Sequence, residues 1–197
     1  MNFKRSFLIA SLAVFFLGAA AAFGADKFDF DPMHTQIGFG VKHLVISTVK
    51  GKFNEFTGTI LYDSSDITKS SVSLTLKTAS INTGVEMRDN DLRSPNFFDA
   101  AKYPEITFQS SRIEKKDDGF VAVGALNMHG VSKEVAIPFT VSDKIKDPRG
   151  KERFGVEGTL TLDRRDWGLT WDKRIESGGL VVGNEVRIEL SVEAVKG

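Results

Sequence analysis

The sequence predicts an all-β protein, a single eight-stranded antiparallel β-barrel. Apolar and polar residues alternate along most of the chain, and turn signals separate the alternating runs. The chain has 197 residues, 41% of them apolar, and a formal net charge of zero. This composition is that of a globular protein, and the length fits one barrel domain. The absence of cysteine excludes disulfides and thiolate chemistry.

Each predicted strand has one apolar and one polar face, as antiparallel strands with one solvated side require. The runs lie at residues 37–41, 49–62, 72–76, 106–108, 120–128, 135–141, 154–162 and 186–192. A motif such as Asp147-Pro148-Arg149-Gly150 is typical of the turns between them. The short apolar run Leu44–Ser47 is predicted to form a helical turn between the first two strands.

One segment has helical rather than strand spacing. Residues 85–92 repeat apolar and charged side chains at helical intervals, and Asn82 or Thr83 is the predicted N-cap. Phe97 and Phe98 follow as an apolar pair. We expect this short helix and its loop to cap one mouth of the barrel, with the two phenylalanines as a plug.

Residues 1–24 have the features of a cleavable secretory signal peptide. Lys4 and Arg5 precede an apolar stretch and small residues typical of a cleavage site. The apolar stretch is about 16 residues, short of the roughly 20 that span a bilayer. We therefore expect an exported protein whose single domain is residues 25–197. Removing two basic residues leaves 26 − 2 = 24 against 26 acidic, a balance that argues against nucleic-acid binding.

The search for reactive groups finds no catalytic or metal site. The three histidines, which lack metal-ligand spacing, are His34, His43 and His129. Asp89 and Asp91 resemble a general acid–base pair, but the neighbouring Arg88 and Arg93 favour local ion pairing. Residues 163–167 are interpreted as a charged turn with an anchored tryptophan. We predict no enzyme activity and no cofactor.

The predicted barrel interior is uniformly apolar. An eight-stranded barrel is just wide enough to be filled by its own side chains or to hold one slender ligand, and the pattern leaves both open. If a ligand is held, the predicted binding residues are Ile37, Phe39, Val41, Leu74, Leu76, Phe97, Phe98, Ile106, Phe108, Ile137, Phe139, Leu160, Leu162, Ile188 and Leu190.

Several motifs, in order along the predicted domain, resemble those of the YceI-like proteins. They are Asp31-Pro32-x-His34-Thr35-x-Ile37-x-Phe39-x-Val41-Lys42-His43-Leu44, Arg88-Asp89-x-x-Leu92-Arg93-Ser94-x-x-Phe97-Phe98-Asp99, Leu126-x-x-His129-Gly130-Val131-Ser132-Lys133 and Arg164-x-Asp166-Trp167-Gly168. Because they span essentially the whole predicted domain, the resemblance is specific.

The resemblance implies a periplasmic, lipocalin-like barrel that holds a polyisoprenoid, an isoprenoid quinone or a similar long-chain amphiphile in its lumen. Arg88 and Arg93 are the candidate head-group contacts at the entrance. A bound lipid is then the expected ligand, without any cofactor. Transient contact with a membrane and a homodimer are further expectations, and the domain is expected to contain no membrane span.

Two alternatives stay open at this point. The first is a stress-related scaffold protein whose barrel is filled by its own core. The second is an enzyme that acts on such a lipid through His34, His43 or the pair Asp89 and Asp91. Loss of turnover in single variants would identify the enzyme, whereas a lipid extracted from the purified protein would identify the binding protein.

Overall fold

The fold is described from a computed structural model that covers residues 24–174, 176 and 178–197. All of the predicted signal peptide except Gly24 lies outside the described residues. The strands are β1 Asp26–Phe30, β2 Gln36–His43, β3 Ser47–Phe53, β4 Phe56–Tyr62, β5 Ser71–Lys77, β6 Ile81–Asn82, β7 Glu105–Lys116, β8 Gly119–Met128, β9 Val131–Val141, β10 Ile145–Lys146, β11 Glu152–Asp163 and β12 Val182–Lys196. The helices are α1 Glu86–Arg93 and the 3₁₀ turns η1 Ile67–Lys69, η2 Thr78–Ser80 and η3 Arg164–Trp167.

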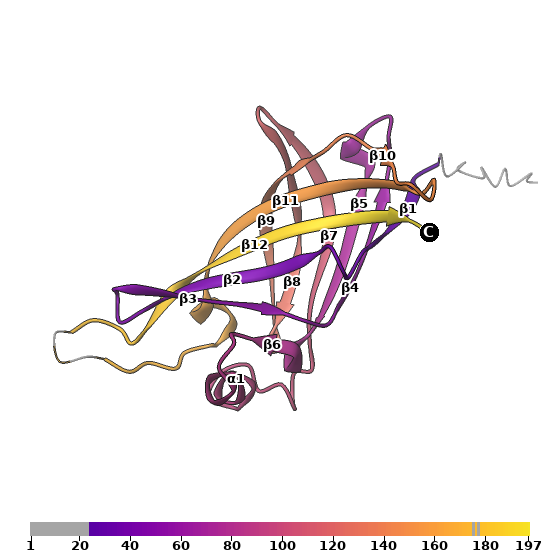
Figure 1. Ribbon diagram of the computed structural model, residues 1–197. Coiled ribbons are helices and arrows are strands. Elements are labelled where there is room, and N and C mark those ends of the chain that lie inside the picture. Colours follow the sequence, from indigo (N-terminus) through magenta and orange to yellow (C-terminus); the bar gives the residue numbers. More distant parts are fainter. Residues whose placement is uncertain (1–23, 175, 177) are drawn as a thin grey trace, which may run out of the picture.

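The strands pair antiparallel in chain order and close into an eight-stranded barrel (Figure 1). Three barrel positions are each shared by two short strands, β1 with β2, β3 with β4, and β5 with β6. For example, β12 pairs with β1 through Lys196 and with β2 through Ser191. The predicted fold class is therefore confirmed, although the predicted run 49–62 is broken into two strands at residues 54–55.

The seam between β9 and β11 is the weakest pairing around the barrel. These strands are in register at three positions, Val141, Thr140 and Phe139 of β9, whereas β11 and β12 pair from Arg153 to Asp163. The 3₁₀ turn η3 is bonded to β9 through Asp166 and Lys133, at 2.8 Å. Trp167 of η3 is 2% exposed and donates from Nε1 to the carbonyl of Leu126 on β8 at 3.2 Å. The predicted anchored tryptophan is thus confirmed.

Helix α1 lies across one end of the barrel (Figure 1), as predicted. The predicted cap is wrong, because the N-cap residue is Val85 and its side chain makes no capping bond. Asp89 instead accepts hydrogen bonds from the backbone N–H and the hydroxyl of Thr83, at 2.8 and 2.6 Å. This buried carboxylate ties the segment in front of the helix to the middle of the helix.

The run Leu44–Ser47 is a tight reverse turn, so the predicted helical turn is also wrong. Leu44 and Val45 both have positive φ, 51° and 67°, and the N–H of Ile46 donates to the carbonyl of His43. Positive φ at both central residues gives the turn the handedness that matches strand twist. The sequence did not predict this turn because Leu and Val rarely adopt a positive φ, and the apolar run was therefore interpreted as helical. No helix in the described part of the chain has the length and apolarity to cross a bilayer.

Candidate functional site: an apolar barrel cavity

The interior of the barrel holds a cavity of about 240 Å³. This is larger than the roughly 150 Å³ engineered cavity that admits a benzene molecule. No polar atom contributes accessible surface to its wall. Inward-facing residues such as Phe39, Leu160 and Leu190 are only partly buried, because their side chains border open space. The interior is thus a cavity and not a filled core.

All fifteen residues predicted to bind a ligand lie on this cavity wall. Strand pairing explains the grouping, because directly opposed residues on adjacent strands point to the same face. Leu160 of β11 opposes Ile188 of β12, and Ile188 opposes Phe39 of β2.

The sequence missed several residues of the wall. Tyr62 and Phe154 lie near one end of the cavity, where their rings are 4.7 Å apart and Phe154 meets the ring of Phe28 at 4.8 Å. Burial raises the pKa of the Tyr62 hydroxyl. Tyr62 continues the alternation of inward-facing residues from Ile60, which could have predicted it. A tyrosine at the end of a strand is equally typical of the protein surface.

Arg164 is the least expected residue of the wall. Its side chain is buried, 5% exposed, and its guanidinium donates to the carbonyls of Leu169, Gly183 and Val182 and to the side chain of Asn184. Burial lowers the pKa of this guanidinium. The guanidinium N–H groups are bonded to backbone carbonyls and to Asn184, so Arg164 presents only its hydrocarbon stem to the cavity. The bonds to Val182 and Gly183 also fix the start of β12.

The two arginines predicted as head-group contacts are not among the residues of the cavity wall. Arg88 donates to the hydroxyl and the carbonyl of Thr83, at 2.7 and 3.1 Å. Arg93 donates to the carbonyls of Ala79 and Ile81, each at 2.7 Å. Arg93 therefore holds α1 against η2 and β6, and Arg88 holds it against the loop residue Thr83. The structure does not bring either side chain to the cavity wall.

The predicted ion pairing of Asp89 and Asp91 with these arginines is wrong. Within the described ranges, neither carboxylate lies at ion-pair distance from Arg88 or Arg93. Asp91 accepts instead from the side-chain amide of Asn96 at 2.8 Å. The carboxylates serve local turns, because each arginine is drawn to backbone carbonyls that the loop leaves without partners.

An aromatic contact joins the predicted plug to a neighbouring loop. The ring of Phe97 stacks on that of Trp171 at 5.4 Å, and Phe98 meets Phe53 edge-on at 6.3 Å. Trp171 belongs to the segment between η3 and β12, so this stack links the α1 cap to that segment. Phe97 and Phe98 both line the cavity.

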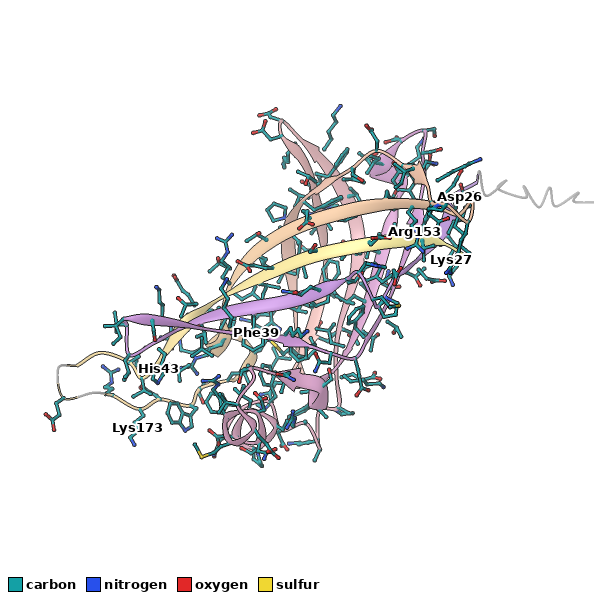
Figure 2. All side chains as sticks on the ribbon, in the orientation of Figure 1. Asp26, Lys27, Phe39, His43, Arg153 and Lys173 are labelled. Atoms are coloured by element: carbon teal, nitrogen blue, oxygen red, sulfur yellow. The ribbon has the colours of Figure 1, made fainter. Side chains whose placement is uncertain are left out.

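A group of charged side chains lies near the other end of the barrel, centred on Arg153 (labelled in Figure 2). Its guanidinium bonds Asp31 at 2.6 Å, Glu193 at 2.6 Å and Asp147 at 2.9 Å. His34 adds a contact to Asp31 at 3.1 Å. The hydrogen bonds from Arg153 and His34 hold the pKa of the Asp31 carboxyl well below its usual range.

Asp31, His34 and Glu193 bring ligand atoms within 4.8 Å of one another, a spacing compatible with a metal ion. The guanidinium of Arg153 already bonds both carboxylates. A metal ion would have to compete with that cation, so the geometry fits a structural ion-pair network better than a metal centre.

This network makes a prediction about acid stability. The pKa of Asp31 is lower in the folded protein than in the unfolded chain, so its contribution is complete above about pH 4 and is lost as the pH falls below that value. We expect Arg153→Met to lower the melting temperature at pH 7 by several degrees and to flatten the acid dependence, as measured by thermal melts between pH 7 and 2. Arg187→Met, which removes an exposed pair with Glu189, is the control and should change neither quantity. An Arg153 variant with the acid profile of the native protein would contradict the prediction.

Comparison with known proteins agrees with this architecture. Residues 28–194 match the YceI-like domain family. A UPF0312 protein of Yersinia pestis (strain Pestoides F) is 33% identical over 194 residues, which cover 98% of each chain. The solved YceI protein of Campylobacter jejuni is 31% identical with a TM-score of 0.69, covering 79% of this chain and 90% of that one. A polyisoprenoid binding domain from Saccharophagus degradans shares the fold at 16% identity and a TM-score of 0.61, covering 86% and 98%.

Proposed function

We propose that this chain, which belongs to the YceI-like family, binds the hydrocarbon part of a long-chain lipid of the polyisoprenoid class inside its barrel. The observation that carries the proposal is the barrel cavity, whose accessible wall surface is wholly apolar. The polyisoprenoid binding domain of S. degradans, which has the same fold, supports the choice of ligand. Binding would be non-covalent sequestration for storage or transport.

The apolar wall favours the hydrocarbon part of a ligand and disfavours its polar head group. Each Å² of apolar surface removed from water contributes about 25 cal/mol, so a buried chain needs no directional contact. A polar head would lose its hydrogen bonds to water inside the cavity and find none in return. We therefore propose that the chain lies within and that the head group, a quinone or a phosphate, stays at or outside the mouth.

The filled-core alternative is disfavoured by the cavity itself. The enzyme alternative gains no support from the geometry, because His43 and Asp89 are not among the residues of the cavity wall, and neither are His34 and Asp91. We accordingly propose a binding protein without catalytic activity. Export to the periplasm stays part of the proposal, because it rests on residues 1–24 alone.

Organic extraction of the purified native protein, followed by mass spectrometry, tests the proposal. We expect a long-chain isoprenoid at a fixed ratio to protein. Protein denatured before purification and then refolded provides the empty control, which should take up an added polyprenol or isoprenoid quinone from detergent. A barrel that is empty as isolated and takes up neither compound would refute the function.

The stack of Phe97 on Trp171 predicts how the ligand leaves. Trp171→Ala removes an aromatic contact worth about 1 kcal/mol, so we expect release to accelerate up to about tenfold. Transfer of a fluorescent isoprenoid to vesicles measures the rate. Phe120→Ala removes a similar stack with Phe139 at 5.7 Å, away from the cap, and is the control. Equal rates in both variants would place the exit elsewhere.

A further inference from the structure

The turn between β2 and β3 exposes two apolar side chains at a projecting end of the molecule. Val45 is 63% exposed and Ile46 is 83% exposed. This hairpin extends well beyond the barrel (Figure 1), and His43 marks its end in Figure 2. We call residues 44–46 the hairpin tip. Isolated exposed apolar residues are common on protein surfaces, but two adjacent ones at a projecting turn are suited to insertion.

The backbone of the hairpin tip argues that the apolar side chains themselves matter. Leu44 and Val45 both occupy the left-handed region, with φ of 51° and 67°. A turn of this kind favours Asn-Gly, and a β-branched residue such as valine is strongly disfavoured there. Val45 gains little from packing in return, because most of its side chain faces solvent. The strain is therefore not explained by folding alone.

The charged residues of the hairpin itself have one sign, although the neighbouring β12 carries the exposed Glu185 and Glu189. Residues 36–53 contain the lysines Lys42, Lys50 and Lys52 and no acidic residue, although the whole chain has a net charge of zero. Lys42 and Lys50 are exposed. An apolar tip with lysines behind it is complementary to a bilayer that contains anionic lipids.

The loop before β12 extends this surface. The N–H of Leu44 donates to the carbonyl of Val181 at 2.9 Å, and Val181 donates to the carbonyl of Lys173 at 2.8 Å. Lys173, labelled in Figure 2, is exposed at the same end. The charges of Asp172 and Arg174 offset each other, because the two side chains lie 3.7 Å apart. The same loop also carries the exposed carboxylate of Glu176.

We propose that the hairpin tip docks the protein on the surface of an anionic lipid bilayer. Val45 and Ile46 enter the interface, while Lys42, Lys50 and Lys173 meet the lipid head groups. A protein partner fits less well, because two side chains are far too small for the roughly 800 Å² that each partner buries in a stable complex. Val41 and Val182, next to the hairpin tip in the sheet, belong to the cavity wall, so docking brings the cavity towards the membrane.

Flotation of the purified domain with vesicles tests the docking. We expect binding to vesicles of phosphatidylcholine with phosphatidylglycerol, little binding to phosphatidylcholine alone, and weakening as salt is raised. The double variant V45D/I46D should lose at least about tenfold in affinity, because two apolar side chains leave the interface. The matched control is M33D/I145D, which places the same charges on residues of similar exposure, 86% and 62%. Ile145 lies on β10, far from the hairpin (Figure 1).

A second variant separates docking from folding. L44N/V45G relieves the left-handed strain, so it should melt no lower than the native protein and still bind vesicles more weakly. Equal losses in V45D/I46D and M33D/I145D would overturn the proposal. So would a native dimer that V45D/I46D converts to monomer without a change in vesicle binding, because the tip would then bind a second copy.

The docking does not depend on the proposed ligand, and the two can fail separately. Vesicle binding by protein that holds no extractable lipid and takes up neither added compound would refute the proposed ligand and leave the docking intact. Extractable lipid in protein that does not bind vesicles would refute the docking and leave the proposed ligand intact.

Discussion

Leu160→Asp is expected to abolish retention of a hydrocarbon ligand, with a loss of at least about 100-fold in affinity. Leu160 lies on the cavity wall and opposes Ile188 across the β11–β12 pair. A carboxylate at this position stays hydrated in the empty cavity, and an entering chain would strip that water away. Desolvating an unpaired polar or charged group costs several kcal/mol. The lipid recovered per protein, measured by mass spectrometry, gives the result.

Thr161→Asp is the matched control for this variant. Thr161 is the next residue of β11, is exposed, and opposes Arg187 on β12, so the same new charge faces solvent and a cation. It should retain the ligand. Leu160→Trp answers the objection that the charged variant is unfolded, because it fills the cavity with apolar volume and should also exclude the chain. Normal ligand content in both Leu160 variants would place the ligand outside the cavity.

Arg164→Ala is expected to destabilise the fold by about 3 kcal/mol, because it leaves several buried oxygen acceptors without donors. Those acceptors are the carbonyls of Leu169, Val182 and Gly183 and the side chain of Asn184. For a domain of this size, the loss corresponds to a fall of about 6–12 °C in melting temperature. Thermal unfolding followed by circular dichroism measures it.

The neighbouring Arg165 gives the control. It is exposed and bonds Asp163 alone among the described side chains, so Arg165→Ala should cost at most about 1 kcal/mol. Arg164→Lys should not rescue stability, because one ammonium group cannot reach acceptors arranged around a planar fork. Equal melting temperatures for the Arg164 and Arg165 alanine variants would show that the buried guanidinium contributes no more than a surface charge.

The alternation of apolar residues was sufficient to predict the barrel and its lining. A strand with period-two alternation buries one face, and eight such strands that close into an antiparallel barrel bury those faces together in its interior. The thirteen predicted binding residues that lie on strands are accordingly on the cavity wall. The same alternation did not predict whether that space was filled, because packing volume depends on how strands tilt and where loops cross.

The charged and irregular segments could not be predicted in the same way. Arg164 and Arg165 are adjacent and chemically identical, yet one is buried against backbone carbonyls and the other is exposed. Arg88 and Arg93 were predicted at the entrance and instead hold α1 through the carbonyls of Thr83, Ala79 and Ile81. The partners of a guanidinium are set by which carbonyls the fold leaves free, and those carbonyls come from other segments.

The sequence by itself determined which faces are apolar, because side-chain polarity and strand period are local properties. Only the tertiary structure decided that the interior is open, that Leu44 and Val45 form a left-handed turn at an exposed tip, and that Arg164 is buried. Each of these depends on contacts between segments far apart in the chain. The turn is imposed by the register of β2 with β3, and the buried charge by the return of β12 beside η3.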